Sequence, residues 1–473
     1  MKQRIIGIIK LDKSVWREFY MSAYYPAFVA ALVVIGSLSG LEYYINFLTT
    51  ALGIGALVIC PSIKPVMITL LTYVYQISLV NSPFYPGYSD FYVTGWRLPV
   101  SIIIIVAVAL AFVYYTVKNR IYKRISLKRT PYLLPTLAFS SALLLNGAFS
   151  GKWQASNLIF GAAHIAVYLV VFLLFYYGLE GEDKGELINY FIYLTLLIAA
   201  VLTAEMLHLF ITSDNIFIDG SINKVGVALG WGIWNLVAVS LAILIPVLFL
   251  GMERCRYPWL YFAAASVVYV LSVLTMSRNA LIFSSLVYAA SLIIFSFVGR
   301  NKRGMRICVL LGIAGVAAIA ILFWDKISAL LADYLERGFS DNGRFALWSA
   351  ALDNFLGAPV FGSGFYGLIV EGQAVFGPLP VMAHNTVLEL LSAMGIAGLA
   401  AYVWYRWETV RTFIRRPSLA KTMLGMAVLV ILLESLLDNF VFNIYPMFYA
   451  MIALAIATRQ DGEEKLDDPD LNA

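Results

Sequence analysis

One histidine in the sequence lies in a pattern that could handle protons. His384 and Asn385 are followed by nine residues, then by Gly395, and three residues later by Gly398. An imidazole can hold or release a proton near neutral pH, and the two glycines leave a smooth helix face for close packing. His384 is therefore a candidate for proton transfer at the start of an apolar helix. Alternatively, it is an interfacial histidine that caps this helix.

Two arginines could bind an anionic partner. Arg278 lies in a short Ser-Arg-Asn hairpin between two apolar runs, and Arg344 lies four residues before Trp348 in a longer polar segment. Both lie close to apolar segments, on the side of the protein that is poor in cations. The structural alternatives are a snorkelling arginine at 278 and a solvated loop charge at 344, with the tryptophan at the interface.

The composition indicates what kind of elements position these residues. The chain has 473 residues, of which 61% are hydrophobic, 15% aromatic and only 13% charged, and its mean hydropathy is +0.82. A soluble domain is closer to a quarter charged and could not hide this much apolar surface from water. The composition therefore excludes a soluble enzyme, a disordered chain and a nucleic-acid-binding protein.

Continuous apolar runs predict an all-α polytopic membrane protein with about 12–14 transmembrane helices, since a transmembrane barrel would show alternating residues. The candidate spans are 23–41, 45–60, 65–80, 99–117, 131–149, 158–178, 187–211, 226–250, 257–274, 280–298, 307–325, 384–404, 422–437 and 443–458. Asp438, Asn439, Asn443 and Pro446 favour a turn between the last two. The long segment before 384 begins with helical apolar spacing and ends in a glycine- and proline-rich loop.

The distribution of Lys and Arg gives an orientation. With the N-terminus in the cytoplasm, 26 of the 33 Lys and Arg residues lie in cytoplasmic segments and 7 lie outside, as the positive-inside rule requires. The C-terminus is then cytoplasmic too. The predicted organisation is a cytoplasmic or interfacial segment at 1–22, transmembrane helices 1–11 at 23–325, an extracytoplasmic loop containing helices at 326–383, C-terminal transmembrane helices at 384–458 and a cytoplasmic acidic tail at 459–473.

Few ionisable side chains lie inside the predicted spans, where they are costly and tend to mark sites. They are His164, Glu205, His208, Glu389 and Glu434, and with this topology each lies in the outer half of its span. This placement favours a site that faces outward. Glu205 and His208 are three residues apart and could also pair with each other.

Together these segments resemble the O-antigen ligase and O-antigen polymerase superfamily. The resemblance covers residues 277–400 and rests on the order of the Ser-Arg hairpin, a loop with Gly-Arg-x3-Trp and Pro-x2-Gly-x-Gly, and the His-Asn-x9-Gly-x2-Gly run. His384, Asn385, Gly395 and Gly398 satisfy the family's ligase pattern without a gap. Upstream, the resemblance rests on softer features such as Trp231-Gly232-x-Trp234-Asn235.

The resemblance implies a membrane-embedded glycosyltransferase. Its donor would be a glycan on undecaprenyl diphosphate at the outer face of the cytoplasmic (inner) membrane, and its acceptor a hydroxyl of a glycolipid, glycan or protein. Transfer would invert the anomeric carbon and need neither a metal nor a cofactor. Membrane lipids would be partners, and nucleic acid would not.

The resemblance also assigns roles to residues of this sequence. His384 would be the catalytic general base, and Arg278 and Arg344 would bind the diphosphate and stabilise its developing charge. Supporting residues would be Asn385, which orients the histidine or a sugar, Trp348, Gly362, Gly364, Gly395 and Gly398. The donor cavity could be lined by His164, Glu205, His208 and Glu389, the last with helix packing as its alternative role.

Three alternatives stay open. A polymerase for O-antigen or surface polysaccharide would use the same donor and a different acceptor, although the match to the ligase pattern favours a ligase. A multipass transporter or flippase fits the composition but would place charged groups at the midplane. A peptidoglycan polymerase of the shape, elongation and division group would rely on a loop aspartate, for which Asp341 and Asp353 are candidates, and would leave the His-Asn motif unexplained.

Overall fold

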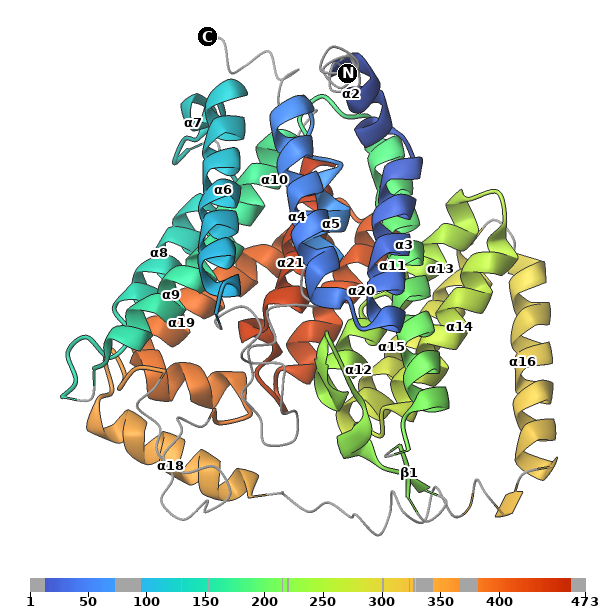
Figure 1. Cartoon of the computed structure of the whole chain (residues 1–473). Helices are drawn as coiled ribbons and strands as arrows, with labels where there is room; N and C mark the ends of the chain where they lie inside the picture. The colour runs from blue at the N-terminus through green and yellow to red at the C-terminus, as the bar shows by residue number, and fades with distance from the viewer. Residues whose placement is uncertain are drawn as a thin grey trace.

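Long apolar helices make up most of the computed structural model of the chain (Figure 1). The structure describes residues 13–72, 95–322, 324–325, 328, 343–365 and 382–460, apart from 129, 152, 215, 219–220 and 300–301. Parts of four predicted segments lie outside the described residues: 1–12 of the N-terminal segment, 73–94 of the first transmembrane segment (23–325), 329–342 (with Asp341) and 366–381 of the extracytoplasmic loop, and 461–473 of the acidic tail.

Seven helical segments of the described chain are long and apolar enough to cross a membrane. They are α4 (Glu42–Ile59), α6 (Arg97–Lys118), the continuous helix of α9 (Ala155–Ile165), η3 (Ala166–Val171) and α10 (Phe172–Gly178), α11 (Lys184–Thr212), the pair α12 (Trp234–Ala242) and α13 (Ile245–Arg254), α15 (Arg278–Phe297) and α19 (Thr386–Ile414). α2 (Lys13–Met21) and α3 (Tyr24–Ser39) pass the same test together, with a bend of 75° between them. The predicted all-α polytopic membrane fold is confirmed.

Other helices complete the bundle. They are α5 (Val66–Thr72), α7 (Ile121–Arg124), α8 (Leu133–Leu144), α14 (Pro258–Leu274), α16 (Lys302–Leu322), α18 (Arg344–Gly357), α20 (Leu419–Glu434), the short η5 (Phe440–Phe442) and α21 (Ile444–Arg459). Each of the fourteen predicted spans holds at least one helix, although only the first part of 65–80 lies within the described residues.

The predicted span at 226–250 begins as a hairpin and not as a helix. β1 (Phe217–Ile218) pairs antiparallel with β2 (Ser221–Ile222), and β3 (Ala228–Leu229) pairs antiparallel with β4 (Gly232–Ile233). Gly232 has a φ of +125°, which an α-helix excludes and which glycine adopts readily. The apolar run therefore turns back on itself before α12 begins.

α21 lies at the centre of the bundle (Figure 1). Every residue from Tyr445 to Thr458 is buried, and α21 contacts α5, α10, α11, α12, α19 and α20. A helix that is apolar all round belongs in such a core. α6 is the opposite case: of its 22 residues only Ala111 and Tyr115 are buried, and most of its isoleucine and valine side chains are exposed, as expected for a helix in contact with lipid.

The two ends of the bundle differ. α2 and α7 lie at one end, and α18 and the β1–β2 hairpin lie at the other (Figure 1). α18 packs against α19 and buries Leu347, Ala351 and Asn354, whereas Phe345 and Leu356 are exposed. α18 therefore covers the end of the bundle at which α19 begins.

α19 is broken at Gly395, which has a φ of 63° and a ψ of −164°. The loop after α18 fills the break with four backbone hydrogen bonds: Ile396 N–H to Pro359 O (2.9 Å), Ala397 N–H to Val360 O (3.1 Å), Ser363 N–H to Ser392 O (2.8 Å) and Gly364 N–H to Ala393 O (2.9 Å). The loop therefore satisfies backbone groups that the helix loses at the break.

Glycine is required on both sides of this contact. A Cβ on Gly395 would overlap the backbone of Val360, and a Cβ on Gly362 would overlap the backbone of Ala393. Both glycines also have a positive φ, which other residues adopt only with strain. One docking contact thus accounts for glycines in two separate sequence motifs.

We expect Gly395→Ala to lower the free energy of unfolding by about 2 kcal/mol or more, because the new Cβ combines an overlap with a strained φ. Thermal unfolding of the purified protein in detergent measures the effect. Gly357→Ala is the matched control, since open space surrounds Gly357 in the same segment. Equal melting temperatures for the two variants would contradict the docking contact.

Candidate functional site

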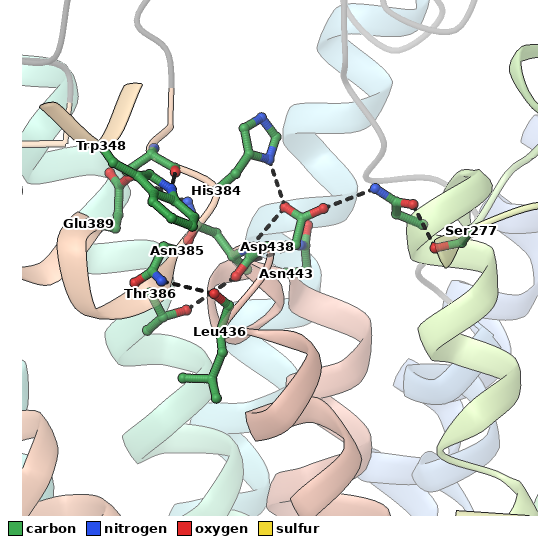
Figure 2. Close-up of polar contacts among 12 residues, drawn as sticks. Ser277, Trp348, His384, Asn385, Thr386, Glu389, Leu436, Asp438 and Asn443 are labelled. Carbon is green, nitrogen blue, oxygen red and sulfur yellow. Dashed lines mark hydrogen bonds and ion pairs between the residues drawn. The ribbon is translucent and has the colours of Figure 1, made fainter. Parts of the chain in front are cut away.

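His384 lies in the link before α19 and faces Asp438, which lies in the turn between α20 and α21 (Figure 2). The Nδ1–H of His384 donates a hydrogen bond of 3.0 Å to Oδ1 of Asp438, because a carboxylate can only accept. The histidine side chain is 42% exposed and the aspartate side chain 14%. The imidazole is therefore anchored on one side and accessible on the other.

Two contacts fix the backbone that carries this imidazole. His384 has a φ of 49°, a strained conformation for a residue other than glycine that is often found at functional sites. The preceding residue, Ala383, donates its N–H to Oε2 of Glu389 at 2.7 Å and accepts the Nε1–H of Trp348 at 2.9 Å. Ala383 is thus held by Trp348 of α18 through its carbonyl oxygen and by Glu389 of α19 through its N–H.

Glu389 also connects the histidine to the turn that carries the aspartate. Its side chain is buried, and Oε2 accepts a second hydrogen bond, of 3.3 Å, from Nδ2 of Asn439. Asn439 directly follows Asp438. The sequence predicted either cavity lining or helix packing for Glu389. In the structure, Glu389 binds the residue before His384 and the residue after Asp438, so it stabilises the position of both partners.

Asn385 caps α19. Its Oδ1 accepts the N–H groups of Val387 and Leu388 at 3.0 and 3.1 Å, and its Nδ2 donates to the carbonyl oxygen of Leu436 at 2.8 Å. An asparagine at this position satisfies helix donors that would otherwise lack partners. The amide therefore ties the start of α19 to the end of α20 and orients His384 through the backbone.

Asp438 binds a second side chain through its other carboxylate oxygen (Figure 2). Oδ2 accepts a hydrogen bond of 3.1 Å from Nδ2 of Asn235, and Oδ1 of Asn235 accepts one of 2.8 Å from the hydroxyl of Ser277. Ser277 is the N-cap of α15 and directly precedes Arg278. A chain of side-chain contacts therefore runs from His384 to the residue beside Arg278.

The two arginines begin two different helices near this chain. Arg278 is the first residue of α15 and Arg344 the first residue of α18. The pKa of Arg344 is lowered, chiefly by burial and also by the positive charge of Arg278, while Asp438 acts in the opposite direction. Helix N-termini carry partial positive charge, so two adjacent cations there concentrate positive potential that an anion would relieve.

Charges around the pair set the proton affinity of His384 and Asp438. Burial lowers the pKa of His384, but the hydrogen bond and the negative charge of Asp438 outweigh burial, so the pKa is raised. Burial raises the pKa of Asp438, but His384 and Arg344 outweigh burial, so the pKa is lowered. His384 is therefore a stronger base than a free imidazole, and Asp438 stays ionised beside it.

The remaining predicted residues have other surroundings. His164 on α9 is buried, with its ring nitrogens 2.8 Å from the carbonyl oxygen of Phe160 and 3.0 Å from that of Phe442. Glu205 on α11 accepts the Nε1–H of Trp231 at 2.6 Å. Trp231, and not His208, is thus the partner that the structure gives to Glu205, because the β3–β4 hairpin places an indole beside this carboxylate.

The predicted glycines and Asp353 lie outside the His384–Asp438 contact. Gly362, Gly364 and Gly395 form the loop contact described above, and a Cβ on Gly398 would meet the Met394 side chain within α19. Asp353 is exposed on α18. Within the described ranges, no three His, Cys, Asp or Glu side chains gather in a way that could hold a metal ion.

Asp438 and Asn235 were not among the predicted site residues. The sequence carries a weak signal for each: Asp438 lies in the polar turn between the last two spans, on the same side as His384, and Asn235 ends the Trp-Gly-x-Trp-Asn feature. Neither signal indicates a partner, because both contacts join residues from different helices.

A comparison with protein families finds a match for part of the chain. Residues 239–403 match the family model described as O-antigen ligase. This region is similar to the O-antigen ligase family. The matched region contains Arg278, Arg344 and His384, whereas Asn235 and Asp438 lie outside it. No match was found among curated proteins.

We expect Asp438→Asn to lower the pKa of His384. The carboxylate favours the imidazolium, so removing its charge makes the proton leave at lower pH. The protein has three histidines, so nitrogen-15 histidine labelling gives few imidazole signals, and His384→Gln assigns the relevant one. Asp353→Asn removes an exposed carboxylate as the control. An unchanged titration midpoint in Asp438→Asn would contradict the ion pair.

Proposed function

We propose that the protein transfers a glycan from undecaprenyl diphosphate to an acceptor hydroxyl at the outer face of the cytoplasmic membrane. The O-antigen ligase family match supports this type of glycosyl transfer. The observation that carries the proposal is the gathering of one histidine–aspartate pair and two arginine charges at one end of the helix bundle. Such a site offers a base to the acceptor and cations to the leaving group.

The arginines act on the leaving group. As the bond between the anomeric carbon and the phosphate oxygen breaks, negative charge develops on the lipid diphosphate. Arg278 and Arg344 face this charge with guanidinium groups, which stay protonated and bind phosphate oxygens through two donors. Fixed charges of this kind need little rearrangement in the transition state, which is why they are effective in catalysis.

His384 acts on the acceptor. With Nδ1–H bonded to Asp438, the neutral imidazole carries its lone pair on Nε2, where it can accept the proton of the acceptor hydroxyl. The acceptor oxygen then bonds to the anomeric carbon while the lipid diphosphate leaves from the opposite face, so the configuration inverts. Asp438 holds the tautomer and stabilises the imidazolium that forms. This step needs no metal.

The charge distribution supports an outward-facing site. The candidate site lies at the end of the bundle that carries α18, opposite α2 and α7 (Figure 1). The α7 end holds basic residues such as Arg120, Lys123 and Arg124, which the positive-inside rule assigns to the cytoplasm. With this orientation the donor would be bound from the outer leaflet.

We expect Arg278→Ala, Arg344→Ala and His384→Ala each to reduce transfer from a lipid-diphosphate-linked glycan by about 10²-fold or more. Purified, folded variants assayed with the same donor and acceptor give the comparison. Arg303→Ala removes an exposed arginine of α16 as the control and should keep full activity. Full activity in any of the three site variants would exclude that residue from the mechanism.

A deletion strain distinguishes ligase from polymerase. A ligase joins finished chains to an acceptor, so its loss should leave long glycans on the lipid carrier. A polymerase lengthens the chains, so its loss should leave single repeat units on a normal acceptor. We expect the first pattern, because the motif around His384 follows the ligase form. Electrophoresis of surface glycan and of the extracted lipid carrier measures both patterns.

A further inference from the structure

Asn235 lies where the two halves of the candidate site meet. His384 lies just before α19 and Asp438 in the α20–α21 turn, whereas Arg278 begins α15, which packs against α12 and α20. Asn235, near the start of α12, contacts both halves through one amide: 3.1 Å to Oδ2 of Asp438 and 2.8 Å to the hydroxyl of Ser277 (Figure 2). It is separated from Asp438 by 203 residues in sequence.

The chemistry of the chain requires an amide at this position. Asp438 can only accept, so the NH₂ group of Asn235 must point toward it, and the amide oxygen is left for the hydroxyl of Ser277. Ser277 in turn accepts the N–H of Ala280 as the cap of α15. Every donor in the chain therefore points toward the carboxylate, and a carboxylate at 235 could not replace the amide.

The position of Asn235 is itself fixed by buried contacts. Trp231 lies four residues earlier in the β3–β4 hairpin, is 2% exposed and donates to Glu205 of α11 at 2.6 Å. Its ring also packs edge-on against Tyr445 of α21, with 4.7 Å between ring centroids. The Trp-Gly-x-Trp-Asn feature thus anchors the hairpin in the core and presents the asparagine at its end.

We propose that Asn235 is a positioning residue that holds the general base and the Arg278 end of α15 at a fixed separation. This inference rests on the proposed function. The charged or titratable side chains that act on the His384–Asp438 pair are Arg344 of α18, Glu389 of α19 and Glu434 of α20. Asn235 adds a neutral donor to this set, so it orients Asp438 without changing the net charge of the site.

Loss of the Asn235–Asp438 hydrogen bond and loss of the Ser277–Asn235 hydrogen bond should change the kinetics in different ways. Asn235→Asp loses the donor to Asp438 and adds a carboxylate beside it, which favours the imidazolium and moves the acid limb of kcat/KM to higher pH. Ser277→Ala keeps the Asn235–Asp438 bond and releases the start of α15, so we expect a higher KM for the donor with an unchanged acid limb. Ser277→Thr keeps the hydroxyl and should restore the donor KM.

The test measures kcat and KM against pH for the purified full-length protein with a lipid-diphosphate-linked glycan. Asn235→Ala should lower kcat by about 10- to 100-fold, because it loosens the base without removing it. Asn119→Ala and Asn119→Asp are matched controls, since Asn119 lies at the end of α6 and its amide binds the carbonyl oxygen of Tyr115. Melting temperatures identify variants that fail to fold.

The outcomes separate this inference from the proposed function. If His384→Ala abolishes transfer while the Asn235 variants match the Asn119 controls in kcat and in acid limb, the inference is wrong and the proposed function stands. If His384→Ala keeps full activity, the proposed function fails and the inference fails with it. If the Asn235 variants do not fold, equal donor KM values for Ser277→Ala and Ser277→Thr would overturn the inference.

Discussion

The hydrogen bond between His384 and Asp438 is the contact on which the candidate site depends. It joins the start of α19 to the turn before α21 across 54 residues of sequence, and the surrounding contacts serve to maintain it. Trp348 and Glu389 fix the peptide before the histidine, and Asn385 ties the two helix ends together. An imidazole held this way keeps one tautomer and one orientation, which is what a base needs before its substrate arrives.

Like-charge repulsion sets a second constraint. Arg344 is partly buried at a helix N-terminus, where a cation is disfavoured, and the positive charge of Arg278 adds to the lowering of its pKa. Such an arrangement costs stability in the empty protein, and stabilising networks elsewhere must offset it. The four backbone bonds between the α18 loop and the break in α19 provide one such network. An anion bound beside these two arginines would relieve that electrostatic cost.

The sequence predicted the membrane fold well because apolar runs and helices coincide in a bilayer. His384, Arg278 and Arg344 were predicted from local motifs, and the structure places His384 beside Asp438. The sequence did not identify Asp438 or Asn235, since their partners lie 54 and 203 residues away and only the packing of α12, α19 and α20 brings them together. The hairpin before Trp234 was wrongly included in a span because its residues are apolar, and the φ of Gly232 decides its conformation.

The burial of α21 has a consequence for how the protein is made. α21 is synthesised after every helix that it touches, and those helices surround it on all sides. The contacts that surround α21 can therefore form only after α21 itself has been synthesised. The turn with Asp438 directly precedes α21, so the His384–Asp438 contact can also form only late in synthesis.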